Sequence, residues 1–325
     1  MKIKYMNKSY APVCLFTYNR LNHTKETVSA LQKNFLAKQT ELFIFSDGPK
    51  TIDSLEQVNS VRVFLKNISG FRKVTILESK ENIGLANSVI NGVSKIINEY
   101  ERVIVLEDDI VTLPNFLDFM NHSLDSFENK GFYSVNGFCP RIISSIKTDY
   151  LIHERSYPWG WGTWKDKWNK VNFNKVYIKD SIISNQIVLK QFSDKFGKDI
   201  SKMLLDSIDG KNDSWYVRWL FNNFNLNYLS IFPNSSLVKN IGFNNPDSTH
   251  CGGLSAYLYT LDNSLKRNFD CKSIIQNKNI NIQFLKYFTK RHKVIFRLRL
   301  LLKPNGFHLI LNELIQTIQN VIKFN

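Results

Sequence analysis

The sequence predicts an α/β protein with a mostly parallel central sheet and flanking helices. In the first half of the chain, short apolar runs alternate with segments of helical spacing. This alternation favours parallel strands that are joined by right-handed helical crossovers. Residues 103–106 are all apolar and lead directly into three acids. An unbroken apolar run of this kind suits a strand that is buried on both faces.

Each element of the first half follows from such a run or from helix signals. Strands are expected at residues 11–17, 41–46, 74–77 and 103–109. Helices are expected at residues 22–38, 53–66, 82–100 and from Pro114 onward. Proline fits the first turn of a helix because its missing N–H is not needed there. In an open parallel sheet the carboxyl ends of the strands meet at one edge, where ligands bind.

The second half of the chain is less regular. Strands are expected at residues 133–138 and 226–232, and helices at 182–196, 214–224 and 307–324. The last of these helices has apolar residues on one face. We therefore expect a main domain at residues 1–255, followed by a basic, amphipathic helical extension at residues 256–325.

The composition is that of a globular protein. Hydrophobic residues make up 43% of the 325 residues, which is enough for a large core. The four cysteines are far apart and resemble reduced thiols of an intracellular protein. The start has no apolar signal segment, and no apolar run approaches the roughly 18 residues of a membrane-spanning helix. We expect a cytoplasmic protein, with a peripheral position on the inner face of the membrane as an added hypothesis.

That hypothesis comes from the net charge of +15, which is unevenly distributed. Residues 271–312 contain no acid and nine basic side chains, interleaved with aliphatic and aromatic residues. Such a segment can lie on an anionic membrane surface or can pack on the domain, and both interpretations stay open. A nucleic-acid partner is not expected, because the basic residues are concentrated in the tail and not spread around a groove.

Glu107, Asp108 and Asp109 form the most informative motif. Three adjacent carboxylates repel one another unless a positive charge lies between them. A divalent cation that carries a diphosphate would supply that charge, because hard cations bridge one or two carboxylates to substrate phosphates. The alternative is a solvated acidic turn, and the apolar strand before it favours the metal.

Polar residues also follow the first two strands. Thr17, Asn19 and Arg20 end the first strand, and Asp47 ends the second. Arg20 can bind a phosphate or a base carbonyl with two N–H groups, and Asp47 can accept from a base N–H. The alternative for Asp47 is ordinary turn chemistry, because Asp-Gly-Pro is a turn sequence.

Asn82 and Gly84 open the third helix of the first half. Gly84 would let backbone N–H groups approach an anionic ligand at the helix start. The segment is not a G-x-G-x-x-G fingerprint, so a dinucleotide-binding fold is not predicted. A plain helix N-terminus is an equally good interpretation.

Trp159, Gly160 and Trp161 belong to a segment in which three Trp alternate with Gly. Flat indole faces beside flexible backbone can stack on sugar rings in a concave site. Core packing near a turn is the alternative for Trp159 and Trp161. Trp164 and Trp168 are expected to anchor a helix.

Two further polar residues are site candidates. Asp213 precedes a predicted amphipathic helix, so it is either the N-cap of that helix or a general base. His250 lies in a Gly-rich loop, where it is either an exposed residue or a ligand for a metal or diphosphate.

Taken together, these motifs resemble glycosyltransferases of the GT-A type. Specifically, they resemble the inverting N-acetylglucosaminyltransferase I-like group and its bacterial relatives in surface-polysaccharide synthesis. The resemblance spans about residues 10–255, and its specific part is Glu107-Asp108-Asp109 followed by Pro114. Asn212 and Asp213 stand where the animal enzymes of the group carry an acidic pair.

The resemblance implies a GT-A, Rossmann-like fold with a donor half at about residues 10–130 and an acceptor half at 131–255. It implies a nucleotide-diphospho-sugar donor, with a UDP-sugar expected, and a Mn²⁺ or Mg²⁺ ion at Asp109, with His250 as a second ligand. Glu107 and Asp108 would contact the ribose and the donor sugar. Asp213 would be the base, and the segment at Trp159 would bind a glycan or lipid-linked acceptor.

The predicted activity is thus transfer of a hexosyl or N-acetylhexosaminyl group with inversion. Two rival functions stay open. A nucleotidyltransferase should have a Gly-rich basic loop after the first strand, and residues 17–21 contain no glycine. A basic nucleic-acid-binding protein fits the net charge but has no use for three adjacent acids.

Overall fold

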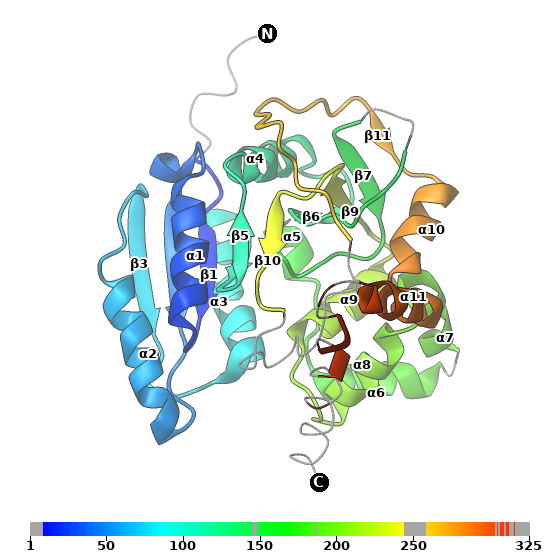
Figure 1. Cartoon of the computed structure of the whole chain (residues 1–325), viewed down its shortest axis with the longest axis horizontal. Coiled ribbons are helices and arrows are strands. Elements are labelled where there is room, and N and C mark those ends of the chain that lie inside the picture. Colours follow the sequence, from blue (N-terminus) through cyan, green and yellow to red (C-terminus); the bar gives the residue numbers. More distant parts are fainter. Residues whose placement is uncertain are drawn as a thin grey trace.

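A nine-stranded sheet forms the centre of the protein (Figure 1). The structure, a computed structural model, describes residues 9–144, 148–185, 187–243 and 258–302, together with 304, 306–308, 310, 311 and 315. The strand order is β11-β7-β9-β6-β8-β4-β1-β2-β3, and a separate pair joins β5 to β10. The fold class is therefore the predicted one, a mixed α/β protein with a large central sheet.

Four neighbouring strands of this sheet are parallel: β4 (Arg102–Glu107), β1 (Val13–Thr17), β2 (Glu41–Ser46) and β3 (Lys73–Glu78). β8 (Trp161–Trp164) then runs antiparallel to both β4 and β6 (Phe132–Asn136). The far edge contains β9 (Leu229–Pro233), β7 (Tyr150–His153) and β11 (Ile274–Ile275). β5 (Ile110–Thr112) and β10 (Val238–Asn240) form the small antiparallel sheet.

Alternation along the strands divides the core between the two faces of the sheet. Val13 and Leu15 of β1 pack in one cluster with α1 (Leu21–Gln32), α2 (Ile52–Leu65) and α4 (Phe116–Ser126). Cys14 and Phe16 point to the other face and pack with α3 (Gly84–Tyr100) and α9 (Trp215–Leu226). This is the period of two that a strand buried on both faces requires.

A short 3-10 helix, η1 (Ala37–Gln39), joins α1 to β2. The remaining helices lie beside the second half of the sheet (Figure 1). They are α5 (Lys165–Trp168), α6 (Lys175–Ser184), α7 (Val188–Phe196), α8 (Ile200–Ile208), α10 (Lys278–Lys286) and α11 (Lys290–Leu301). No helix among the described residues has the length and apolar content needed to cross a bilayer.

Most predicted elements are present, and the differences are local. The predicted strand at residues 41–46 has the observed bounds of β2. The predicted helix at residues 182–196 is wrong, because α6 ends at Ser184 and α7 begins at Val188. β8 was not predicted as a strand. Most of the predicted helix at 307–324 and the predicted domain boundary at 255 lie outside the described residues.

Candidate functional site

The carboxyl ends of β1, β2 and β4 bring three of the predicted motifs to one edge of the sheet. Thr17 pairs in register with Ser46, and Phe16 pairs with Glu107. The residues that follow these positions, Arg20, Asp47 and the acids 108 and 109, therefore leave the sheet at the same edge. β4 ends at Glu107, so Asp108 and Asp109 lie in the turn before β5.

Arg20 binds both aspartates of this turn. Its Nε donates to Asp108 Oδ2 at 3.3 Å, and its Nη2 donates to Asp108 Oδ1. The same Nη2 also donates to Asp109 Oδ2 at 3.1 Å. The Arg20 side chain is 17% exposed, and the two acids are 5% and 8% exposed. One guanidinium thus offsets part of the charge of three adjacent acids in a largely desolvated place.

The remaining negative charge is reflected in the pKa values of the acids. Burial, and then the charges of Asp109 and Asp108, raise the pKa of Glu107 to about 8, while a hydrogen bond from Trp215 opposes the rise. Burial also raises the pKa of Asp108, although Arg20 acts against it. For Arg20 the attraction of Asp108 and Asp109 outweighs burial, so its pKa is raised. The turn is therefore an electrostatically strained place that an added cation would stabilise.

Asp109 has an oxygen that fits such a cation. Its Oδ1 is buried and has no hydrogen-bond partner in the described part of the chain. Gly242 lies against the other oxygen, because a Cβ built at Gly242 would be 2.2 Å from Asp109 Oδ2. Ile241 N donates to the Asp109 carbonyl oxygen at 2.9 Å. The segment that leads toward His250 thus passes directly over Asp109, while His250 itself lies outside the described residues.

The described residues do not form a complete metal cage. Among them, no three His, Cys, Asp or Glu side chains are grouped to hold an ion. A site with one protein carboxylate still suits Mg²⁺ or Mn²⁺, because such ions keep several waters and take substrate phosphates as ligands. The Asp109 oxygen that has no partner within the described part of the chain fits this kind of site.

Asp47 organises the start of α3. Its Oδ1 accepts from Gly48 N at 2.8 Å and from Ile83 N at 3.0 Å. Its Oδ2 accepts from Gly84 N at 3.0 Å and from Asn82 Nδ2 at 3.1 Å. Both oxygens are therefore engaged with the segment at 82–84, which Asp47 holds in place in the manner of an N-cap. Gly84 has a φ of +80°, a conformation that favours glycine.

Asp213 reaches this segment from the second half of the chain. A Cβ at Gly84 would lie 3.5 Å from Asp213 Oδ2. Asp213 Oδ1 accepts from Arg218 Nη2 at 3.2 Å and lies 3.7 Å from Lys175 Nζ, and its side chain is 48% exposed. The N-cap of α9 is Ser214, whose hydroxyl accepts from Val217 N. The N-cap interpretation of Asp213 is therefore wrong, and its carboxylate is open to solvent beside the start of α3.

The two candidate tryptophans have different surroundings. Trp161 is 1% exposed, and its ring centroid lies 5.2 Å from those of Trp215 and Trp219 and 5.9 Å from that of Trp168. The structure thus places Trp161 in the core, where it offers no free face to a sugar. Trp159 is half-buried and packs edge-to-face against Phe138 and Phe243. Trp159 keeps the exposure that an acceptor contact needs.

Three other predicted residues have structural partners. Gly160 has a φ of +65°, and its carbonyl oxygen accepts from Gly137 N at 2.6 Å, so it shapes the turn into β8. Thr17 Oγ1 donates to the Phe45 carbonyl oxygen at 3.4 Å, and Asn19 Nδ2 donates to Gln57 Oε1 at 2.7 Å. Thr17 is buried and Asn19 is half-buried, close to Arg20 at the same strand end.

Two residues of the site were not predicted from the sequence. Trp215 contacts Glu107 from α9, and Gly242 contacts Asp109 from the end of the small sheet. Trp215 stands two positions after Asp213 in a motif that resembles the base segment of the family, but its contact with Glu107 was not predicted. Both contacts join residues that are far apart in the chain. The only sequence signal for Gly242 is its place in a Gly/Asn-rich loop.

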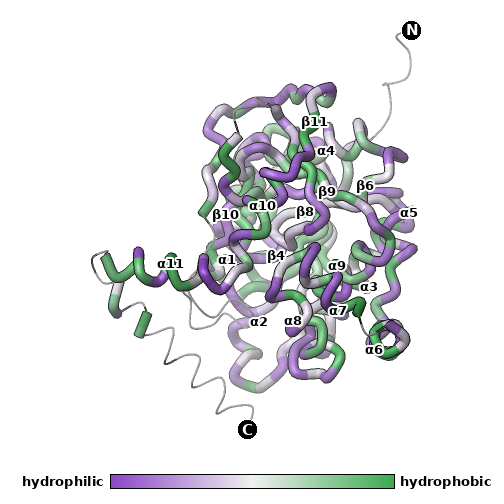
Figure 2. The backbone as a smooth tube through the Cα atoms, turned by 90° about the vertical axis from the view of Figure 1, so that its right-hand side faces the viewer, coloured by the Kyte–Doolittle hydropathy of each residue, from purple (hydrophilic) through white to green (hydrophobic). Residues whose placement is uncertain are grey.

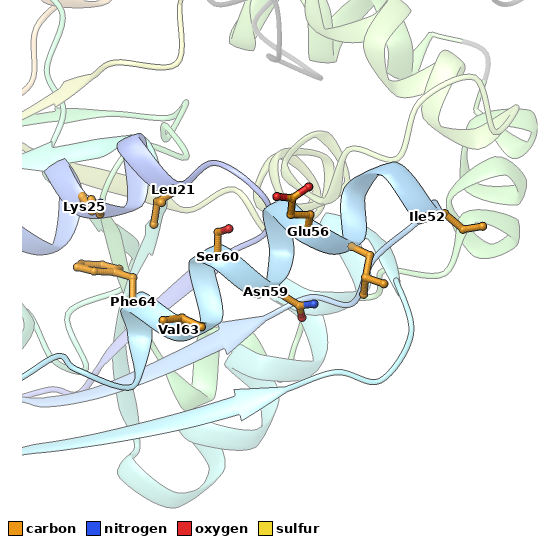
Figure 3. Close-up of a pocket in the computed structure, with 9 residues that line it drawn as sticks. Leu21, Lys25, Ile52, Glu56, Asn59, Ser60, Val63 and Phe64 are labelled. Carbon is orange, nitrogen blue, oxygen red and sulfur yellow. The ribbon is translucent and has the colours of Figure 1, made fainter.

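A hollow of about 710 Å³ lies elsewhere, between α1 and α2 (Figure 3). Its lining combines apolar and polar side chains, with Lys25 and Glu56 as its charged members. None of the predicted site residues lines it. The hollow is therefore a different place in the structure from the turn that contains Asp108 and Asp109.

Comparisons with known proteins give structural matches alone. No protein-family model matches the chain, and the curated proteins contain no match to it. Mannosyltransferase PcManGT from Pyrobaculum calidifontis, solved with GDP-Man and Mn²⁺, is similar to 49% of this chain over 46% of its own, with 13% identity and a TM-score of 0.36. S. aureus TarS matches 70% of this chain over 36% of its own, with 12% identity and a TM-score of 0.37.

A third similar structure is a putative nucleotide-diphospho-sugar transferase from Desulfovibrio desulfuricans G20. It matches 48% of this chain over 65% of its own, with 14% identity and a TM-score of 0.29. The chain thus spans less than two thirds of each of these three proteins. At TM-scores this low, the similarities do not assign the chain to a family.

Proposed function

We propose that this protein is a glycosyltransferase that moves a sugar from a nucleotide-diphospho-sugar to a hydroxyl group of an acceptor, with inversion at the anomeric carbon. The observation that carries the proposal is the buried Oδ1 of Asp109, which has no hydrogen-bond partner among the described residues and lies beside Arg20 at the carboxyl end of β4. A carboxylate oxygen and a guanidinium at one sheet edge together suit a cation and a diphosphate.

The donor would lie along the ends of β1, β2 and β4. Arg20 would bind the diphosphate, and Thr17 and Asn19 would line the nucleoside side. Asp47 would act through Asn82 and Gly84, whose backbone it already fixes. Glu107 and Asp108 would contact the ribose and the sugar.

A Mn²⁺ or Mg²⁺ ion would be held by Asp109, with His250 as a further proposed ligand. When bound, the ion would neutralise the diphosphate and so make it a better leaving group. Side chains of the protein would supply the other interactions with the diphosphate. Arg20 would hold the phosphate oxygens on which negative charge develops, and its half-buried position would make that interaction strong.

Asp213 would act as the general base. Its carboxylate would take the proton of the acceptor hydroxyl, and the hydroxyl oxygen would attack the anomeric carbon of the donor. The bond from that carbon to the phosphate oxygen would break, and the nucleoside diphosphate would leave with the bonding electrons. The support for this role is the exposed carboxylate of Asp213 beside Gly84. The acceptor, a glycan or a lipid-linked glycan, would contact Trp159.

A thermal-shift screen tests the proposal directly. The full chain is heated with UDP-, GDP- and other nucleotide-sugars, each with and without Mn²⁺. We expect at least one nucleotide-sugar to raise the melting temperature in a Mn²⁺-dependent way, because a ligand that binds only the folded state stabilises it. Release of nucleoside diphosphate by the same pair would then report turnover. A screen with no Mn²⁺-dependent shift for any nucleotide-sugar contradicts the proposal.

A further inference from the structure

Helix α11 exposes a stripe of aliphatic side chains. Val294, Leu298 and Leu301 are 54%, 57% and 47% exposed. Their spacing of four and three residues places them on one face of the helix. Figure 2 shows α11 projecting from the body of the protein, with hydrophobic and hydrophilic residues alternating along it. We call these three residues the aliphatic stripe.

Basic side chains border the aliphatic stripe on both sides. At 100° per residue, Lys290 and Arg297 fall on one border and Arg291 on the other, and all three are exposed. The surrounding residues 271–312 contain nine basic side chains and no acid. The face therefore combines exposed aliphatic groups with exposed basic side chains.

The aliphatic stripe is not part of the hydrophobic core. Other residues of α10, of α11 and of the segment between them pack against the rest of the protein. Ile280 and Phe284 of α10 are buried, and the Phe284 ring stacks on His153 with centroids 4.4 Å apart. The Arg155 guanidinium lies 3.4 Å from the centroid of the Phe288 ring. Leu300, on the opposite face of α11, is 7% exposed. Within the residues that the structure describes, the aliphatic stripe of α11 thus stays exposed.

The chemistry of this face distinguishes between three kinds of partner. A second copy would bring the same positive charge against itself, and like charges would repel. A nucleic acid would suit the charge, but the stripe has no aromatic ring on which a base could stack. An anionic lipid surface suits both parts, because aliphatic side chains enter the acyl boundary while Lys and Arg contact the headgroups.

We infer that the outward face of α11 is a membrane-docking surface for anionic lipid headgroups. It would place the protein at the surface of a bilayer without a membrane-spanning helix. The inference goes beyond the proposed enzyme activity and does not depend on it.

Vesicle flotation with the full chain tests the inference. We expect the protein to float with vesicles that contain anionic phospholipid and to remain in the dense fraction with neutral phosphatidylcholine vesicles. Leu298→Glu should abolish flotation, and Arg291→Gln with Arg297→Gln should reduce lipid affinity by about fivefold for each lost charge. Raising the salt concentration should weaken binding in the same direction.

Two matched controls keep the test specific. Ile183→Glu replaces an aliphatic residue of α6 that is 65% exposed, and Arg72→Gln removes an arginine whose side chain is 58% exposed. Both variants should float like the parent protein. Equal binding to neutral vesicles, unchanged flotation of Leu298→Glu, or a dimer that only Leu298→Glu dissociates would each overturn the inference.

Discussion

Arg20 and Asp108 form a two-point ion pair at the carboxyl end of the parallel strands, and Arg20 also reaches Asp109. The guanidinium thus lies where a divalent cation would also be attracted. Arg20 offsets part of the charge of Glu107, Asp108 and Asp109. When a cation binds to these acids, their interactions with Arg20 must change. This relationship makes the carboxylate turn testable by changes in binding as well as by changes in turnover.

The first prediction concerns Arg20→Gln. Removal of the guanidinium leaves more negative charge on the turn, so Mn²⁺ alone should bind more tightly. If the repulsion between Arg20 and the ion costs ~1.4 kcal/mol, its removal should increase the affinity for Mn²⁺ about tenfold. The same variant should bind a nucleoside diphosphate more weakly, because a charge-assisted hydrogen bond is lost. Isothermal titration of Mn²⁺ and of nucleoside diphosphate measures both changes. Weaker Mn²⁺ binding by Arg20→Gln would show that Arg20 does not compete with a cation.

The second prediction concerns Asp109→Asn. This change keeps the shape of the side chain but removes the charge beside Arg20 and leaves one neutral amide oxygen, a weaker cation ligand, in place of the carboxylate. Donor binding should lose its dependence on Mn²⁺, and turnover should fall below detection. Nucleotide-sugar affinity with and without Mn²⁺ is the measurement, with Asp53→Asn on the exposed start of α2 as the control. Equal Mn²⁺ dependence in Asp109→Asn and the parent protein would remove Asp109 from the cation site.

The third prediction separates Asp213 from its neighbour. Asp213→Asn should lower kcat by about 10²–10⁴-fold and leave donor affinity unchanged, because general-base catalysis acts on the chemical step. Ser214→Ala should do the opposite. It removes the N-cap of α9 and should cost about 1 kcal/mol of stability while turnover persists. Near-normal turnover in Asp213→Asn would assign the base to another residue.

The fourth prediction compares two glycines with the same backbone conformation. Gly84 has a φ of +80° and Gly131 a φ of +77°, so alanine at either position should cost about 1–2 kcal/mol of stability. A Cβ at Gly131 meets no atom within 4 Å, whereas a Cβ at Gly84 faces Asp213. Donor affinity should therefore fall in Gly84→Ala alone. Equal affinities in the two variants would mean that the segment held by Asp47 does not contact the donor.

The parallel half of the fold could be predicted because its signals are local. Each strand there is an apolar run, and each run ends in polar residues. β8 was missed for a physical reason: glycine weakens a strand, and Trp161-Gly162-Thr163-Trp164 suggests a flexible segment. The structure explains the glycine by close packing, because a Cβ at Gly162 would be 2.9 Å from the Val103 carbonyl oxygen.

The candidate site was predictable to a similar extent. The acids and Arg20 stand at strand ends, and a parallel sheet brings strand ends together whatever the loops do. The burial of Trp161 depends on Trp215 and Trp219, which are more than fifty positions away in the chain. Spacing within one segment contains no information about such contacts, so the choice between a sugar-stacking face and core packing needed the structure.

The fifth prediction concerns His153, a residue that belongs to none of the motifs described above. The ring is fully buried, and its Nδ1 accepts a hydrogen bond from Arg155 N at 2.9 Å. Burial lowers the pKa of His153 to about 3, helped by the charges of Arg155 and Lys195. His153 therefore stays neutral in the folded protein at pH values where it is protonated in the unfolded chain.

This difference gives stability a defined dependence on pH. Below the ordinary histidine pKa of about 6.5 and above about 3, the unfolded chain binds the additional proton, so the free energy of unfolding falls as the pH is lowered. The contribution of one histidine has a limiting slope of about 1.4 kcal/mol per pH unit and vanishes above about pH 6.5.

His153→Asn keeps an acceptor for Arg155 N but cannot titrate. Urea unfolding between pH 4.5 and 7.5 should therefore show a shallower acid loss for His153→Asn than for the parent protein, while the exposed His308→Asn control follows the parent curve. Parallel curves for all three proteins would mean that His153 is protonated in the folded state and that its stacking on Phe284 tolerates a charge.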